Sequence, residues 1–114
     1  MAKAAAIKLV EIGSMADFNK ITKENKDKII VCDFYATWCG PCKMISPKYK
    51  ELSQKYGKKL VFCECDVDAA EDFVEHCGVN AMPTFIFFKN GKQQSSIKGA
   101  DVKALTTKIE EYAK

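Results

Sequence analysis

The sequence of 114 residues lacks several features that mark large classes of protein. No apolar run approaches the ~18 residues of a membrane-spanning helix, so we expect no membrane span. The net charge is only +3 and the lysines are spread along the whole chain, without a basic stripe interleaved with aromatics. Nucleic acid is therefore not expected as a main ligand.

The first residues lack the pattern of a secretory signal. Lys8 and Glu11 interrupt any apolar segment there, and the patterning of a folded domain begins at once. We therefore expect a cytoplasmic protein. In that reducing compartment the six cysteines should stay mostly thiols, so a close pair of them indicates catalysis or metal binding.

The chain also lacks linkers, repeats and low-complexity tracts, which predicts a single domain over residues 1–114. Apolar residues make up 47% and charged residues 29% of the sequence. A chain of this length buries roughly two-thirds of the surface that its unfolded form exposes. It can therefore build a core without disulfide or metal staples.

Apolar spacing and turn residues predict five strands and four helices. Strands are expected at 7–12, Ile29–Tyr35, Leu60–Asp66, Thr84–Lys89 and 93–98, and helices at 15–26, from the cysteine pair to Gly57, at 70–77 and after Asp101. The strand, helix and strand over residues 29–66 form a βαβ unit, which predicts parallel pairing. The fold class is thus α/β, a five-stranded mixed sheet with helices on both faces.

Local signals predict the ends of these elements. Ser14 and Asp101 can cap the first and last helices. Asn90-Gly91 is a strong hairpin turn between the last two strands. In the last helix, apolar spacing predicts an inward face that consists of Val102, Leu105 and Ile109.

Two cysteines separated by two residues stand where a buried strand gives way to a helix: Cys39-Gly40-Pro41-Cys42. At this spacing their Cβ atoms lie roughly 5–6 Å apart, close to disulfide range. The unpaired N–H groups of a first helical turn favour a thiolate, and Lys43 adds positive charge. Gly40 leaves the first sulfur open, and Pro41 is tolerated in a first turn while it restricts the loop. These features favour a reversible dithiol/disulfide.

A zinc site and a pair of incidental thiols are the alternatives. Zinc would need two more ligands, for which the candidates are Cys63, Cys65, His76 and Cys77. Only one residue separates Cys63 from Cys65, where zinc sites usually have two to four, and both lie in a predicted buried strand. Incidental thiols would leave the strand-to-helix placement unexplained. We therefore expect a redox pair and no metal.

The stretch YATWCGPCK at residues 35–43 resembles the active-site signature of the thioredoxin family. The likeness extends to Asp33-Phe34 before it, to Met82-Pro83-Thr84-Phe85, and to residues 98–100 after the hairpin. The sequence is most similar to the animal-type cytosolic thioredoxins. The resemblance implies a thioredoxin fold and a protein-disulfide reductase.

The resemblance also implies roles for single residues. Cys39 would be the nucleophile that forms a mixed disulfide with an oxidised substrate, and Cys42 would resolve it. A substrate-binding apolar surface would consist of Trp38, Met82, Pro83, Gly99 and Ala100. Pro83 matches the cis-proline of the family, and the backbone of Met82 would pair with an extended substrate segment.

Asp33 lies among apolar residues of a predicted strand, so we expect desolvation to raise its pKa. It would then be a candidate proton carrier for Cys42. The alternative is an aspartate that faces solvent at a strand edge. Many thioredoxins carry a lysine near this aspartate, whereas this sequence has Glu64 there.

As the family implies, a flavoprotein thioredoxin reductase that uses NADPH would recharge the protein, which itself would bind no cofactor. Its substrates would be oxidised proteins such as peroxiredoxin, methionine sulfoxide reductase and ribonucleotide reductase, in a role of electron transport and cell redox homeostasis. An oxidase or isomerase is an alternative, against which Pro41 and the missing signal argue. A further alternative is a module that binds a partner without catalysis.

The remaining cysteines are expected in the core. Cys63 and Cys65 lie on one face of a strand, too far apart for a disulfide. Cys32 is expected on the face opposite Asp33, and His76 on the surface. Cys77 continues an apolar helix face, so we expect it to be buried, slow to react and without a disulfide partner. We expect a monomer, with a dimer linked through Cys77 as the competing hypothesis.

Overall fold

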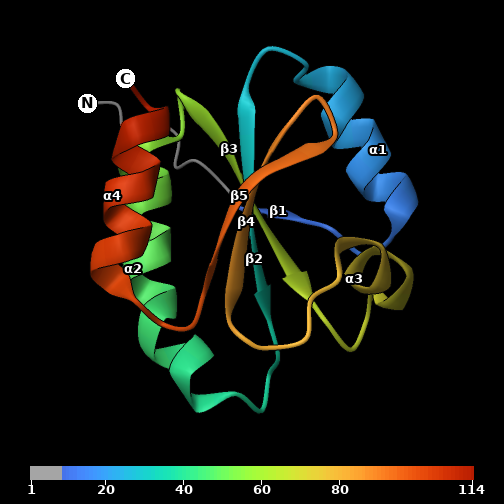
Figure 1. The fold of residues 1–114 in the computed structure, drawn as a ribbon, viewed down its shortest axis with the longest axis vertical. Helices are drawn as coiled ribbons and strands as arrows, with labels where there is room; N and C mark the ends of the chain where they lie inside the picture. The colour runs from blue at the N-terminus through green and yellow to red at the C-terminus, as the bar shows by residue number, and fades with distance from the viewer. Residues whose placement is uncertain (1–8) are drawn as a thin grey trace, which may run out of the picture.

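The computed structural model describes residues 9–114 of the chain. In chain order the elements are β1 (Val10–Glu11), α1 (Met15–Glu24), β2 (Ile29–Tyr35), α2 (Gly40–Tyr56), β3 (Leu60–Asp66), α3 (Glu71–Cys77), β4 (Thr84–Lys89), β5 (Lys92–Lys98) and α4 (Val102–Tyr112). The predicted order of strands and helices is confirmed (Figure 1). Of the first strand predicted at 7–12, residues 7 and 8 lie outside the described residues, and the strand itself is shorter than predicted, covering Val10–Glu11.

The strands form one mixed sheet in the order β1-β3-β2-β4-β5. The pairs β1–β3 and β2–β3 are parallel, whereas β2–β4 and β4–β5 are antiparallel. β2 occupies the middle and its five central residues are buried. This position explains its nearly continuous apolar sequence, because a central strand is covered on both faces.

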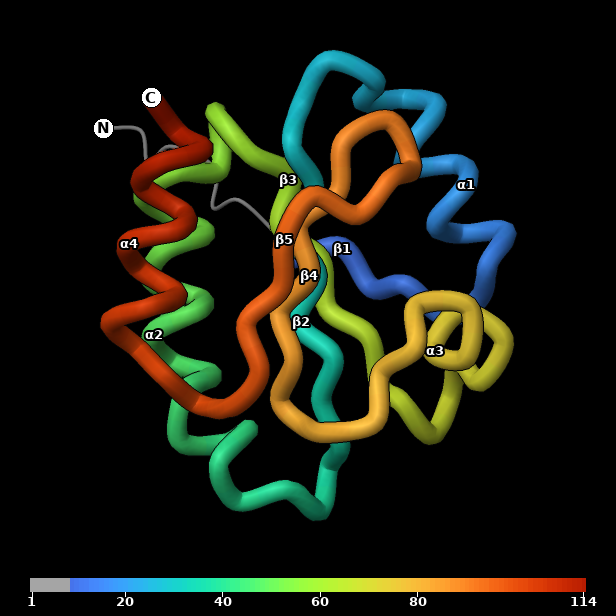
Figure 2. Tube along the Cα trace, viewed as in Figure 1, coloured from blue at the N-terminus to red at the C-terminus, as the bar shows by residue number. Residues whose placement is uncertain are grey.

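Helices cover both faces of the sheet, as predicted. Figures 1 and 2 show α2 and α4 side by side on one face and α1 and α3 on the other. Alternation along the strands divides the core accordingly: Val31 and Phe85 pack on the α2/α4 side, and Phe34 and Phe88 on the α1/α3 side. Asp33 lies one position from Phe34, and therefore on the α2/α4 face.

The predicted local signals are present. Ser14 and Asp101 cap α1 and α4 by accepting backbone N–H groups of the first turns. Asn90 and Gly91 have φ of 52° and 84°, the left-handed conformation that a tight hairpin turn requires. α1 ends at Glu24, two residues earlier than predicted, and β5 begins one residue earlier.

One predicted core residue is on the surface. Leu105 and Ile109 of α4 are fully buried, but Val102 is 43% exposed. Helical spacing places Val102 on the same side of α4 as Leu105 and Ile109. It belongs to the first turn after the Asp101 cap, and the spacing does not show whether a neighbour covers that turn.

The topology brings segments that are distant in sequence to one end of the sheet, where strands begin or end. The parallel strands β2 and β3 end there, and the antiparallel partner β4 starts there, because Phe34 pairs with Thr84 and Thr84 with Lys98. In Figure 2 this is the lower end of the sheet, where the chain leaves β2 and enters α2.

Within residues 9–114, no helix combines the length and apolar character needed to span a membrane.

Candidate active site

Cys39 and Cys42 form a disulfide at the start of α2. Their Cα atoms are 5.3 Å apart. Cys39 is the N-cap residue of the helix, and its Sγ accepts the backbone N–H of Cys42 at 3.2 Å. A helix N-terminus stabilises negative charge on such a sulfur, so the reduced pair can supply a thiolate.

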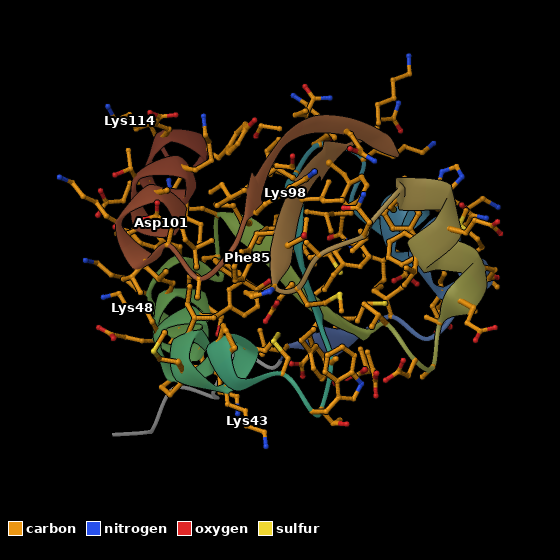
Figure 3. All side chains as sticks on the ribbon, turned by 60° about the horizontal axis from the view of Figure 1, so that its bottom comes forward. Lys43, Lys48, Phe85, Lys98, Asp101 and Lys114 are labelled. Carbon is orange, nitrogen blue, oxygen red and sulfur yellow. A yellow bond between two sulfur atoms is a disulfide. The ribbon has the colours of Figure 1, made fainter. Side chains whose placement is uncertain are left out.

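Cys39 is only 6% exposed, and open space lies next to it at Gly40. A Cβ built on Gly40 would meet no atom within 4 Å. Lys43 extends outward from the start of α2 (Figure 3). Trp38 is 67% exposed, and its Nε1 donates to Asp68 Oδ2 at 2.9 Å. That hydrogen bond gives an exposed indole a fixed orientation beside the disulfide.

The segment before β4 lies against the disulfide. The Sγ atom of Cys39 is 3.8 Å from the carbonyl oxygen of Met82. The Met82–Pro83 peptide bond is cis, as the resemblance implied. The backbone N–H of Gly99 donates to the Pro83 oxygen at 2.8 Å, which places Gly99 and Ala100 beside the same segment. The structure thus brings together residues from three loops; Met82, Gly99 and Ala100 are half-buried and Pro83 is buried.

Asp33 is buried in β2, near the end of the sheet where the disulfide lies, with only 4% of its surface exposed. Burial, and secondarily the nearby charge of Glu64, raises the pKa of its carboxyl from the ordinary 3.8 to about 7. Among the described residues its Oδ1 has no hydrogen-bond partner. The expected desolvation is confirmed, and the alternative of a solvent-facing aspartate is wrong.

A cavity of about 300 Å³ lies between Asp33 and Cys42. Its lining consists of Asp33, Tyr35, Ala36, Thr37, Cys42, Lys43, Ser46, Lys50 and Glu64. Sequence reasoning did not identify Ser46 and Lys50 as part of this site. Their spacing from Cys42, at i+4 and i+8, places all three on one face of α2 and could have indicated it.

The other four cysteines are free thiols on the α1/α3 side of the core: Cys32, Cys63, Cys65 and Cys77. Burial raises the pKa of the Cys63, Cys65 and Cys77 thiols to about 12. Their predicted core placement is confirmed, as is the exposed position of His76. In the range 9–114, no group of His, Cys, Asp and Glu side chains is arranged to hold a metal ion.

Comparison with known proteins agrees with this site. The model of the thioredoxin family matches residues 9–111. The thioredoxin of Gallus gallus is 48% identical over 98 residues, which cover 86% of this chain and 92% of that protein. The crystal structure of Malassezia sympodialis thioredoxin superimposes with a TM-score of 0.91 at 37% identity, covering 100% of this chain and 98% of that chain.

A third similar chain comes from a structural study of thiol resolution in a yeast mitochondrial 1-Cys peroxiredoxin via glutathione/thioredoxin systems. It has a TM-score of 0.83 and 37% identity, and the match covers 95% of this chain and 99% of that chain. The fold, the Cys39–Cys42 disulfide and these likenesses agree with one another. The chain therefore belongs to the thioredoxin family, in its animal-type branch, and is a protein-disulfide oxidoreductase.

Proposed function

We propose that the protein is a general protein-disulfide reductase that cycles Cys39–Cys42 between dithiol and disulfide and so maintains cell redox homeostasis. The observation that carries this proposal is the placement of Cys39 Sγ at the N-cap of α2, where it accepts the Cys42 N–H. Lys43 adds a positive charge beside the pair. Such a sulfur is suited to attack as a thiolate, and the open space at Gly40 would leave room for a protein substrate beside it.

In the first step the Cys39 thiolate attacks one sulfur of a substrate disulfide. The substrate S–S bond breaks, a mixed disulfide forms, and the other substrate sulfur leaves as a thiolate that takes a proton from solvent. In the second step Cys42 loses its proton and attacks Cys39 Sγ. The Cys39–Cys42 bond forms and the second substrate thiolate leaves, so two electrons pass to the substrate.

Asp33 would accept the Cys42 proton in the second step. The cavity that both residues line supports this role, because a water molecule next to its polar side chains can bridge a thiol and a carboxyl. A pKa of about 7 also suits a group that takes up and returns a proton near neutral pH.

The substrate would bind over Trp38, Met82, Pro83, Gly99 and Ala100. The contact of Cys39 Sγ with the Met82 carbonyl supports this placement, because a substrate sulfur bonded to Cys39 would lie beside that backbone. An extended substrate segment could then pair with Met82 as a short added strand. Gly40, Pro41 and Lys43 would set the accessibility and the reduction potential of the pair.

Electrons would come from NADPH through a flavoprotein thioredoxin reductase, and the protein itself would bind no cofactor. Oxidised protein substrates would include peroxiredoxin, methionine sulfoxide reductase and ribonucleotide reductase. The similar chain from the peroxiredoxin study supports the first of these. We propose that the protein acts as a monomer in the cytoplasm, where reducing conditions would keep its four other cysteines as thiols.

Insulin reduction tests the proposal. With thioredoxin reductase and NADPH present, adding the protein should drive NADPH consumption and insulin precipitation, and Cys39→Ser should abolish both. A protein that is reduced by the reductase yet leaves insulin intact would refute a general reductase. Titration with glutathione should give a reducing potential, whereas an oxidising one would favour an oxidase or isomerase.

A further inference from the structure

Asp33 and Glu64 hold the same register position on the adjacent parallel strands β2 and β3. Their Cα atoms are therefore separated by the strand spacing of ~4.8 Å, and both side chains lie on the α2/α4 face of the sheet. The i, i+4, i+8 stripe of α2, which consists of Cys42, Ser46 and Lys50, also lines this cavity. Two carboxyl groups, of Asp33 and Glu64, and two ammonium groups, of Lys43 and Lys50, thus belong to the lining next to Cys42.

Asp33, Glu64 and Lys50 differ in exposure. Asp33 is buried, Glu64 is half-buried and Lys50 is exposed. Glu64 raises the pKa of Asp33, since two neighbouring carboxylates repel each other. Burial raises the pKa of Glu64 itself, and the charge of Lys50 counteracts that rise.

We propose that Lys50 holds Glu64 in its ionised form, and that the charge of Glu64 sets the proton affinity of Asp33. Glu64 and Lys50 are then positioning residues, because neither touches a reacting sulfur in this scheme. The significance for catalysis rests on the proposed role of Asp33 as proton acceptor for Cys42. Without the negative charge of Glu64, Asp33 would be a weaker base toward that thiol.

Other groups that face Asp33 do not supply this charge. On β4 its register partner is Phe85, which is apolar. Tyr49 of α2 contacts two backbone carbonyl oxygens through its hydroxyl group. Tyr35 and Lys43 line the cavity but carry no carboxylate. Cys32 of β2 points to the opposite, α1/α3 face of the sheet. Within the described lining, Glu64 is therefore the one carboxylate other than Asp33; Glu11, the register partner of Glu64 on β1, is a further carboxyl group outside that lining.

The test is a ¹³C NMR titration of side-chain carboxyl groups in the oxidised protein, without substrate. Glu64→Gln should move the midpoint of Asp33 to lower pH by roughly half a unit or more, since it removes a neighbouring negative charge. Lys50→Gln should move the midpoint of Glu64 to higher pH. Matched controls on α2 are Glu51→Gln and Lys48→Gln, which make the same charge changes away from the cavity and should leave both midpoints in place.

Glu64→Asp keeps the charge and should restore a raised Asp33 midpoint, which separates electrostatics from damage to the fold. The double variant Glu64→Gln, Lys50→Gln should give the Asp33 midpoint of Glu64→Gln alone. An Asp33 midpoint that is unchanged in Glu64→Gln, or that moves equally in the controls, would overturn the proposal. So would a Glu64 midpoint that is unaffected by Lys50→Gln.

A kinetic measurement keeps this proposal distinct from the role of Asp33. The decay of a preformed mixed disulfide on Cys39 isolates the attack by Cys42, and its pH midpoint should fall in Glu64→Gln in parallel with the NMR midpoint. Suppose that the Asp33 midpoint moves in Glu64→Gln, while the mixed disulfide of Asp33→Asn decays at the wild-type rate. The charge pair is then confirmed and the proton-carrier role fails. Suppose instead that the mixed disulfide of Asp33→Asn decays slowly, while the Asp33 midpoint is unchanged in Glu64→Gln. The charge pair then fails and the carrier role stands.

Discussion

Trp38 and Asp68 lie 30 positions apart in the sequence and are joined by a hydrogen bond of 2.9 Å from Nε1 to Oδ2. The indole is 67% exposed beside Cys39, so little packing holds it. An exposed apolar ring in a fixed orientation presents a preformed contact surface, which lowers the entropy lost when a substrate binds.

We therefore expect Asp68→Ala to weaken substrate binding. Loss of one partly exposed hydrogen bond costs about 0.5–1.5 kcal/mol, which would raise the KM for insulin by roughly two- to tenfold with little change in kcat. Since Trp38 is the single tryptophan of the sequence, its fluorescence should also change. Glu75→Ala on α3 makes the same charge change and should alter neither quantity; an unchanged KM in Asp68→Ala would show that the orientation of Trp38 is irrelevant.

The two active cysteines should fail in different ways. Cys39 is the N-cap thiol next to the substrate surface, so Cys39→Ser should abolish disulfide reduction. Cys42→Ser should still attack but stop as a covalent mixed disulfide, because no second thiolate can release the substrate. Mass spectrometry of each variant after incubation with oxidised insulin distinguishes them. Trapping of substrate by the Cys39 variant alone would reverse the assigned roles.

Much of this site follows from local sequence. The strand Ile29–Tyr35 and the turn into α2 were predicted because a buried apolar run and a helix start have direct local signatures. The raised pKa of Asp33 followed from its apolar neighbours. The place of Lys50 did not, because it depends on the register of β2 against β3 and on the way α2 packs over both. The exposure of Val102 has a similar origin, since spacing identifies a face and not what covers it.

Asp33 should make the oxidised protein less stable as the pH rises. The folded carboxyl, with a pKa of about 7, keeps a proton that the unfolded chain releases near its ordinary 3.8. The higher affinity of the folded state for this proton stabilises the fold. That stabilisation is complete below pH 4 and is lost progressively as the pH rises to about 7. A shift of this size corresponds to a loss on the order of 4 kcal/mol in the free energy of unfolding.

Asp33→Asn stays neutral and should remove this loss. Urea unfolding should show the variant more stable than the wild type at pH 8, with the difference shrinking toward pH 4. Glu51→Gln, an exposed carboxyl on α2, serves as the control and should follow the wild type. Parallel stability curves for Asp33→Asn and wild type would mean that the aspartate titrates normally in the folded protein.

Pro41 should keep the pair reducing. An uncharged ring between the two cysteines leaves the helix start as the main stabiliser of the Cys39 thiolate. Pro41→His would place a potential positive charge beside that thiolate, stabilise the reduced form and raise the reduction potential. Glutathione titration measures the change, and the shift should grow as the pH falls and the imidazole becomes charged. An unchanged or lower potential contradicts this account.

Cys77 tests the prediction of a single redox-active disulfide. It is 9% exposed at the end of α3, and burial raises the pKa of its thiol to about 12. Small residues occupy the positions where a second disulfide partner could stand, Ala70 on the same helix face and Ala81 before Met82. A thiol in this environment is mostly protonated at neutral pH and poorly accessible, so it should react slowly.

Brief alkylation of the reduced, folded protein followed by peptide mapping measures that reactivity. Cys39 should be labelled first and Cys77 should lag at least about tenfold behind, because the start of α2 favours the Cys39 thiolate whereas a pKa of about 12 leaves little of Cys77 as thiolate. Labelling after denaturation provides the control, since all six cysteines should then react. Comparable labelling of Cys39 and Cys77 in the folded protein would show that the end of α3 opens next to Gly78, where the helix terminates. In that case a dimer linked through Cys77 under oxidising conditions becomes the favoured hypothesis.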